Sequence, residues 1–240
     1  MKVYLINLDK DTERLAAQRE QFASRGLPFE RVSAHETSAY NGFRWWCAVL
    51  RPVVKGELGC AASHCECYRR MKACKAECAA VFEDDVLLSG SAKPAIGKAE
   101  LFCRDNPRAV VLLGNHHKSK DGSPLIDGNF SNDCFEIVPE LWDNCSEGYV
   151  IGREAASKLL DIQSPVRVPA DWWSYFRRKG WIDLYRIEPS VCGQQTSRFE
   201  SNLGERYVCA GKRFRERVWW RMRRAVGVVV DTVMDGRRGW

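Results

Sequence analysis

Long apolar runs are missing from this 240-residue sequence. No segment approaches the roughly 20 apolar residues of a membrane-spanning helix, and the opening MKVYLINLDK holds too short an apolar run for a secretory signal. Internal repeats and low-complexity tracts are missing too. We therefore expect a protein that is not exported and is cytoplasmic, either in solution or peripheral on the inner face of the membrane.

The sequence contains no CxxC pair among its eleven cysteines, an odd number that does not fit a closed set of disulfides. Most cysteines lie inside periodic segments, which argues for reduced thiols in a reducing compartment. Cys74 and Cys78 are four residues apart, but tetrahedral zinc usually gathers short-spaced pairs from more than one element. We therefore interpret these thiols as small core residues and not as a zinc site.

Positive charge is concentrated near the end of the chain. With 45% hydrophobic residues the chain can bury one substantial core. Between Arg206 and Arg224 eight basic residues stand against one acid, whereas the whole chain nets +6, so the remainder is slightly negative. We predict one domain over residues 1–204 and a basic, tryptophan-containing amphipathic tail over residues 205–240.

The tail segment VWWRMRR predicts a helix with Trp219 and Met222 on one side and arginines on another, as interfacial helices have. We expect this tail to dock on an anionic membrane surface. A solubilising or disordered tail is the alternative. Nucleic-acid binding through the tail is a rival role, but no recognition motif supports it, so no nucleic-acid partner is expected.

The order of elements predicts an α/β fold. A strand at residues 3–8, a helix to about residue 24 and a strand at 29–33 open the chain. A helix from residue 57 to about 78 would place four cysteines on one face, and a buried strand at 79–82 follows it. Further strands are expected at 110–113, 134–138, 148–151 and 182–187, and further helices at 153–162 and 171–179.

Three consecutive acids, Glu83, Asp84 and Asp85, come directly after the buried strand in AAVFEDDVLL. Taken alone, such a triplet is more often a solvated turn or a helix cap. The functional interpretation is a platform for Mn²⁺ or Mg²⁺, which prefer carboxylate oxygens and bridge to nucleotide phosphates. Alternate residues of an extended strand point the same way, so we expect Glu83 and Asp85 to converge while Asp84 points elsewhere.

A series of segments around this triplet resembles a known family. VYLINLDKDTER, GELGCAASH, AVFEDDVLL, EGYVIGREAASKLL, VPAD and PSVCGQQTSRFESNL are similar, in that order, to the motifs of glycosyltransferase family 25. The resemblance covers about residues 1–204. It implies a GT-A type α/β fold, with a mixed, mostly parallel sheet flanked by helices in a single domain, and a UDP-sugar bound at an acidic metal motif.

Candidate donor-binding residues follow from this resemblance. Asn7, Leu8 and Arg14 would meet the base, ribose or phosphates at the first strand-to-helix turn. The alternative for Arg14 is an ion pair with a nearby acid, and for His64 a satisfied core position or a general base. The remaining donor candidates are Gly59, Ser63, His64, Glu83, Asp84 and Gly148.

Asp171 in VPAD is the candidate catalytic base, because an inverting transfer needs a carboxylate to take the proton of the acceptor hydroxyl. A helix N-cap is its alternative role. Trp172 and Trp173 would form an acceptor platform, as would Trp45 and Trp46, although core packing is the commoner fate of tryptophan.

The predicted metal ligands are Glu83, Asp85 and Gln195. Several GT-A enzymes take a third ligand, often histidine, from near the end of the fold, yet no histidine follows residue 117 here. Gln194 or Gln195 occupies the corresponding place in the chain, so we expect water to complete the metal shell.

These features lead to one main hypothesis, a metal-dependent, inverting glycosyltransferase. It would move a hexose, galactose from UDP-galactose, to a saccharide or glycolipid acceptor such as a lipopolysaccharide core. The alternative is a noncatalytic protein that binds nucleotide sugars or saccharides on the same fold.

Overall fold

The computed structural model describes residues 1–35, 55–114, 134–142, 146–166 and 168–194. Its contacts divide the chain into two units, Met1–Asn202 and Leu203–Trp240, and all the described residues lie in the first. The boundary predicted between residues 204 and 205 lies outside the described residues and stays a prediction.

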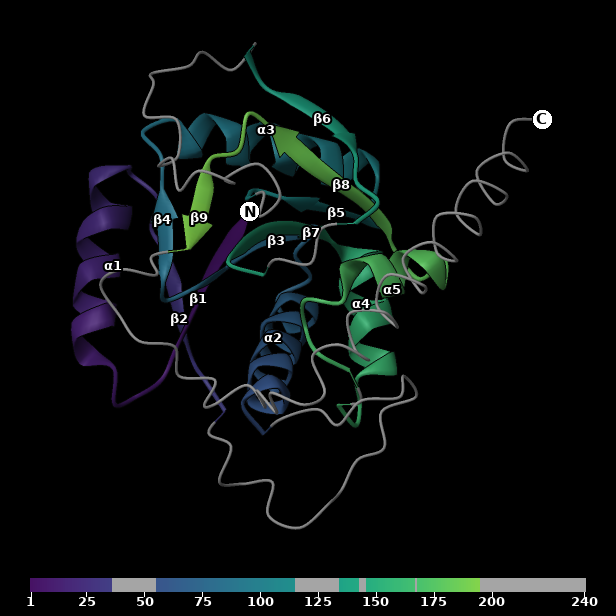
Figure 1. The fold of residues 1–240 in the computed structure, drawn as a ribbon, viewed down its shortest axis with the longest axis horizontal. Helices are drawn as coiled ribbons and strands as arrows, with labels where there is room; N and C mark the ends of the chain where they lie inside the picture. Colours follow the sequence, from purple (N-terminus) through teal and green to yellow (C-terminus); the bar gives the residue numbers. More distant parts are fainter. Residues whose placement is uncertain (36–54, 115–133, 143–145, 167, 195–240) are drawn as a thin grey trace, which may run out of the picture. The chain divides into compact units, whose positions relative to one another are not determined.

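Strands and helices alternate through most of the described chain (Figure 1). The helices are α1 (Thr12–Ser24), α2 (Lys55–Ala73), α3 (Ala92–Asp105), α4 (Arg153–Ile162) and α5 (Trp173–Arg178). The strands are β1 (Lys2–Asn7), β2 (Glu30–Ser33), β3 (Cys78–Glu83), β4 (Val86–Leu88), β5 (Ala109–Leu112), β6 (Glu136–Pro139), β7 (Gly148–Gly152), β8 (Asp183–Glu188) and β9 (Cys192–Gln194).

Seven of the described strands form one mixed sheet in the order β2-β1-β3-β7-β5-β8-β6. The strand pairs make β1, β2, β3, β5 and β8 run in one direction, whereas β7 and β6 run in the other. The prediction of a mixed, mostly parallel sheet flanked by helices is confirmed. A second, two-stranded sheet pairs β4 with β9.

Helices cover both faces of the large sheet, so its central strands are apolar on both sides. Successive residues of a strand point to opposite faces. In β3, Ala79 and Val81 pack with α2, α4 and α5, whereas Ala80 and Phe82 pack with α1 and α3. Figure 1 shows α2, α4 and α5 on one side of the sheet and α3 on the other.

Most predicted elements are confirmed to within one or two residues, and α4 coincides with its prediction. The long helix differs, because α2 ends at Ala73 and Lys75 takes a positive φ of 55°, which breaks the helical path. The shared cysteine face is therefore wrong: Cys74 is exposed beyond the helix and Cys78 begins β3. The strands β4 and β9 and the helix α3 have no counterpart in the sequence prediction.

No helix among the described residues is both long enough and apolar enough to cross a membrane.

Candidate active site

The acidic triplet lies where several chain segments meet at one edge of the sheet. β1 and β3 are parallel neighbours that both end there, with Ile6 opposite Glu83. β7 runs antiparallel to β3, so its first residue, Gly148, pairs with Phe82 and β7 begins at the same edge. In α/β sheets this edge, at the carboxyl ends of the parallel strands, is where ligands gather.

Glu83 continues the face of β3 that packs on α2, and its carboxylate meets side chains from α2 and from the segment before β7. Ser146 donates a hydrogen bond to Oε1 at 2.5 Å, and His64 Nε2 lies 3.4 Å from the same oxygen. Burial disfavours the charge of Glu83, but the contacts with His64 and Ser146 outweigh it and lower the pKa of the carboxyl. Glu83 is therefore a carboxylate at neutral pH.

His64 is buried, with 1% of its surface exposed. Its Nδ1 lies 2.6 Å from the hydroxyl of Tyr149, which in turn lies 2.8 Å from the hydroxyl of Tyr68. Its Nε2 is buried and makes no hydrogen bond of good geometry with the described residues, although it faces Glu83 within ion-pair distance. The ring is thus held from one side, and its second nitrogen points at the acidic edge.

Asp84 points to the opposite face of the strand and meets β1 and α1. Its carboxylate accepts hydrogen bonds from Asn7 Nδ2 at 2.7 Å and from Arg14 at 3.0 Å. Gln18 Nε2 donates to the backbone oxygens of Asp84 and Val86 at 3.1 and 2.9 Å. Burial nevertheless raises the pKa of Asp84, with the two donors opposing that shift.

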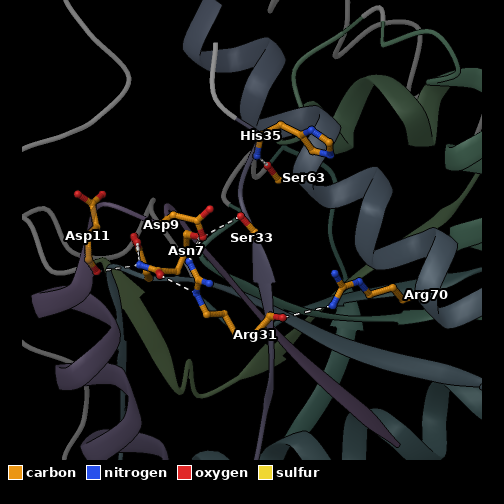
Figure 2. Close-up of polar contacts among 9 residues, drawn as sticks. Asn7, Asp9, Asp11, Arg31, Ser33, His35, Ser63 and Arg70 are labelled. Atoms are coloured by element: carbon orange, nitrogen blue, oxygen red, sulfur yellow. Dashed lines mark hydrogen bonds and ion pairs between the residues drawn. The ribbon is translucent and has the colours of Figure 1, made fainter. Parts of the chain in front are cut away.

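Asn7 is the centre of a polar network at the ends of β1 and β2 (Figure 2). Its Nδ2 also donates to the backbone oxygen of Asp11 at 3.1 Å, and its Oδ1 accepts from Arg31 Nε at 2.9 Å. Asp9 in turn accepts from Arg31 and Ser33. Asn7 and Arg14, both predicted to bind the donor, thus meet at Asp84, as the ion-pair alternative for Arg14 expects. Their contact with a donor stays a prediction.

Asp85 completes the triplet beside the small sheet. Its Oδ2 accepts from Gln194 Nε2 at 2.8 Å, whereas its Oδ1 is buried without a hydrogen-bond partner among the described residues. Burial, followed by the negative charge of Glu83, raises the pKa of Asp85 to about 6. The negative charge of Glu83 therefore disfavours the charge of Asp85, while the convergence of the two carboxylates on one ion stays a prediction.

The predicted donor residues Ser63, Gly59, Leu8 and Gly148 have structural contacts at this edge. Ser63 is buried, and its hydroxyl donates to the Gly59 oxygen at 2.7 Å. The same hydroxyl accepts from the backbone nitrogen of His35 at 2.9 Å (Figure 2). The Leu8 oxygen accepts from the backbone nitrogen of Asp11 at 3.0 Å, closing the turn after β1. Direct contact of these four residues with a donor stays a prediction.

Gly148 lets β7 approach β3 closely. A Cβ at this position would lie 2.8 Å from Phe82 Cδ1 and 2.9 Å from Cys192 Sγ, closer than real Cβ contacts. Glycine is therefore required at position 148 by the packing of β7 against Phe82 and Cys192, independently of any contact with a ligand.

Asp171 lies within electrostatic reach of the acidic edge. Burial raises the pKa of the Cys60 thiol, and the negative charges of Glu83 and then Asp171 raise it further. The N-cap position of α5 is Trp172, so Asp171 precedes the cap that its alternative role would require. The structure thus brings the candidate base within electrostatic reach of Cys60, while its part in catalysis stays a prediction.

The two tryptophans after Asp171 differ in burial. Trp173 is fully buried, with its ring centroid 4.8 Å from that of Tyr149, so it exposes no face to an acceptor in this structure. Trp172 is only partly buried and packs against Tyr175. Trp45, Trp46 and Gln195 lie outside the described residues, whereas Gln194, the other glutamine candidate, contacts Asp85.

Residues that the sequence analysis did not select also contact the triplet. Cys60 Sγ lies 4.0 Å from Glu83 Oε1, Ser146 binds the same oxygen, and Gln18 holds the backbone after Asp84. Among these three residues, only Cys60 could have been selected from the sequence, because it stands four residues before His64 and so lies on the same face of the helix.

The fold is that of an α/β protein with a cluster of carboxylates, the candidate ligand site, at the carboxyl ends of its parallel strands. The profile of glycosyltransferase family 25 (LPS biosynthesis protein) matches residues 1–173. The chain therefore belongs to glycosyltransferase family 25 and is a glycosyltransferase. Membership implies a nucleotide-sugar donor and a saccharide acceptor.

Individual relatives are about a quarter identical to this chain over the aligned residues. The lacto-N-neotetraose biosynthesis glycosyltransferase LgtE of Neisseria gonorrhoeae is 27% identical over 216 residues, which cover 81% of this chain and 74% of the relative. The lacto-N-neotetraose biosynthesis glycosyltransferase LgtB of Neisseria meningitidis serogroup A is 26% identical over 215 residues, which cover 81% of this chain and 75% of the relative. A glycosyltransferase 25 family member of Anopheles gambiae is 27% identical over 174 residues, 67% of this chain and 28% of the relative.

Proposed function

We propose that the protein transfers galactose from UDP-galactose to a saccharide acceptor such as a lipopolysaccharide core, with inversion at the anomeric carbon and with Mn²⁺ or Mg²⁺ as cofactor. The observation that carries the proposal is the acidic edge, where Glu83 and Asp85 repel each other and Asp85 Oδ1 lacks a hydrogen-bond partner among the described residues. Two relatives named for lacto-N-neotetraose biosynthesis support an oligosaccharide acceptor.

The residues present fit a hard divalent cation. A buried carboxylate oxygen without a donor is costly, and two carboxylates close enough to repel are relieved by a positive charge between them. Glu83 and Asp85 would hold the ion, with Gln194 already placed against Asp85 and Gln195 following it in the chain. When bound, such an ion supplies positive charge that stabilises a departing diphosphate.

Asn7 and Arg14 are proposed to support donor binding by holding the carboxylate of Asp84 in place. Their hydrogen bonds hold the Asp84 carboxylate on the α1 side of β3, and Gln18 fixes the backbone that follows. In this proposal Glu83 and Asp85 face the nucleotide and the cation. A rigid acidic turn of this kind is preorganised, so less ordering is needed when the donor arrives.

Asp171 is proposed as the general base. It would accept the proton of the acceptor hydroxyl as that oxygen attacks the anomeric carbon from the face opposite the diphosphate. Its charge reaches Cys60 beside Glu83, which supports a position near the donor. The adjacent Trp172 keeps part of its ring accessible for the CH groups of an acceptor sugar, whereas Trp173 serves the core.

The test combines a binding assay and a transfer assay on the purified full chain. We expect UDP with Mn²⁺ to raise the melting temperature, and UDP-galactose to be preferred over other UDP-sugars in transfer to a lipopolysaccharide-core acceptor. Asp171→Asn should abolish transfer and retain UDP binding. A wild-type protein that binds no UDP with Mn²⁺ present would sink the proposal, and one that binds UDP but transfers no sugar would indicate a noncatalytic binding protein.

The basic tail, residues 205–240, is proposed to hold the protein peripherally on an anionic membrane surface at the cytoplasmic face. Its eight basic residues between Arg206 and Arg224 support this electrostatic attachment. The full chain should sediment with phosphatidylserine vesicles at low salt and not with neutral phosphatidylcholine vesicles. Equal sedimentation with both would contradict the electrostatic basis.

A further inference from the structure

We propose that Cys60, His64 and Glu83 form a binding site for a divalent cation of the zinc class, distinct in its donor set from the oxygen platform for Mn²⁺ or Mg²⁺. The three ligand atoms, Sγ, Nε2 and a carboxylate oxygen, all lie within 4.8 Å of one another. The binding of such a cation does not depend on the proposed transfer reaction.

The distances match the requirements of a tetrahedral ion. Zinc bonds of about 2.0–2.3 Å at tetrahedral angles place ligand atoms about 3.3–3.7 Å apart. His64 Nε2 lies 3.4 Å from Glu83 Oε1, which already meets that spacing. Cys60 Sγ lies 4.0 Å from the same oxygen and within 4.8 Å of His64 Nε2, so a shift of the Cys60 side chain by up to about 1 Å would complete the set. Water would occupy the fourth position.

The α2 helix places its two proposed zinc ligands, Cys60 and His64, next to each other. Cys60 and His64 are four residues apart in α2, so their side chains share one face of the helix. The alternation of β3 turns Glu83 toward that same helix, since Ala79 and Val81 pack on it. The cysteine pair considered from the sequence, Cys74 and Cys78, lies in no single element and forms no comparable group.

His64 carries the independent observation that points to a ligand. The residue is 1% exposed, and its buried Nε2 makes no hydrogen bond with the described residues while it points to Glu83. Its Nδ1 lies 2.6 Å from the Tyr149 hydroxyl, which can accept a hydrogen bond from Nδ1–H, and in that tautomer Nε2 carries the lone pair that a metal binds. Tyr68 braces Tyr149 at 2.8 Å, a supporting arrangement of the kind that orients metal-binding histidines.

The donor set selects the class of cation. Mg²⁺ and Mn²⁺ favour oxygen ligands, whereas thiolate and imidazole favour zinc and its heavier relative cadmium. Binding would form one metal–sulfur bond and release the proton of the Cys60 thiol to solvent, with no oxidation or reduction. Cys60 is partly buried as a residue, and burial of its thiol raises the pKa that metal binding would have to overcome.

Glu83 belongs to both the zinc-class site and the proposed oxygen platform. A zinc ion bound in the zinc-class site would occupy the Glu83 carboxylate, which could then no longer bind Mn²⁺ or Mg²⁺ in the oxygen platform. If the proposed transfer reaction is correct, zinc therefore inhibits it, and excess Mn²⁺ opposes the inhibition.

The test measures Zn²⁺ binding by calorimetry to the reduced, metal-stripped full chain, with Cd²⁺ as a second probe whose thiolate bond absorbs in the ultraviolet. We expect Cys60→Ser to lose one bound Zn²⁺ or to bind it at least about tenfold more weakly, and to lose one cadmium–thiolate band. The matched control Cys74→Ser, an exposed thiol outside the cluster, should behave as wild type.

A second variant shows whether a loss of Zn²⁺ binding in Cys60→Ser comes from the lost ligand or from misfolding. Glu83→Gln keeps the shape of the side chain and should weaken Zn²⁺ binding with the Cys60 thiol intact, with circular dichroism as a check on the fold. Zn²⁺ binding that is unchanged in both Cys60→Ser and Glu83→Gln would overturn the inference. Because these readouts need no sugar transfer, a failure here leaves the proposed enzyme untouched, and a failure of transfer leaves the metal result valid.

Discussion

The ion pair between Arg14 and Asp84 joins α1 to the turn after β3, and Arg14→Met tests how much it stabilises the fold. The side chains are 10% and 12% exposed, so this pair is largely shielded from water. Removing one partner of a buried pair costs about 3–5 kcal/mol, because the other charge stays buried. Asp84 retains its hydrogen bond from Asn7, so we expect the lower end, about 3 kcal/mol.

Urea unfolding followed by circular dichroism provides the measurement, with equal m-values required before the midpoints are compared. The thermal midpoint should fall by about 6–12 °C for a domain of this size. The matched control is Arg69→Met, which removes an exposed pair with Glu66 and should cost less than about 1 kcal/mol. Combining Arg14→Met with Asp84→Asn should restore part of the loss, because no buried charge is then left alone.

The reasoning would be refuted if Arg14→Met lost no more stability than Arg69→Met. A double variant whose loss equals the sum of the two single losses would equally contradict a direct interaction.

Three further predictions concern packing, pH and metal. Gly148→Ala should cost about 1–3 kcal/mol by urea unfolding, because its Cβ would lie 2.8 Å from a ring carbon of β3, whereas Gly97→Ala, in open space within α3, should be neutral or stabilising. Glu140 is buried, yet hydrogen bonds from the backbone and from Arg186 outweigh the effect of burial and lower the pKa of its carboxyl. The ionised carboxyl therefore stabilises the fold above the ordinary glutamate pKa of about 4.3, and this stabilisation is lost as the pH falls through the lowered pKa. Wild type should therefore exceed Glu140→Gln in stability at pH 7, and the difference should shrink in acid; a constant difference would contradict this. Asp85→Asn should lose the thermal stabilisation by Mn²⁺ with UDP, and full retention would argue against Asp85 as a ligand.

Local patterns made much of the architecture predictable from sequence. A buried run followed by three acids marked the end of β3, and the apolar period of residues 153–162 marked α4 to the residue. Weakly patterned segments were missed, among them the three-residue strands β4 and β9, which exist because they pair with each other over a hundred residues apart. Such pairing has no local signal.

What the sequence by itself determined is the order of elements, the motif series that identifies the family, and the alternation that separates Asp84 from its neighbours. These depend on backbone geometry within a few residues of each position. The tertiary structure alone decided the partners: Asp84 met Asn7 and Arg14 from 77 and 70 positions earlier, and Glu83 met Ser146 from 63 positions later. It also placed Trp173 in the core. Strand order in the sheet sets those contacts, and burial of apolar surface across the whole domain selects that order, so no local stretch of sequence encodes it.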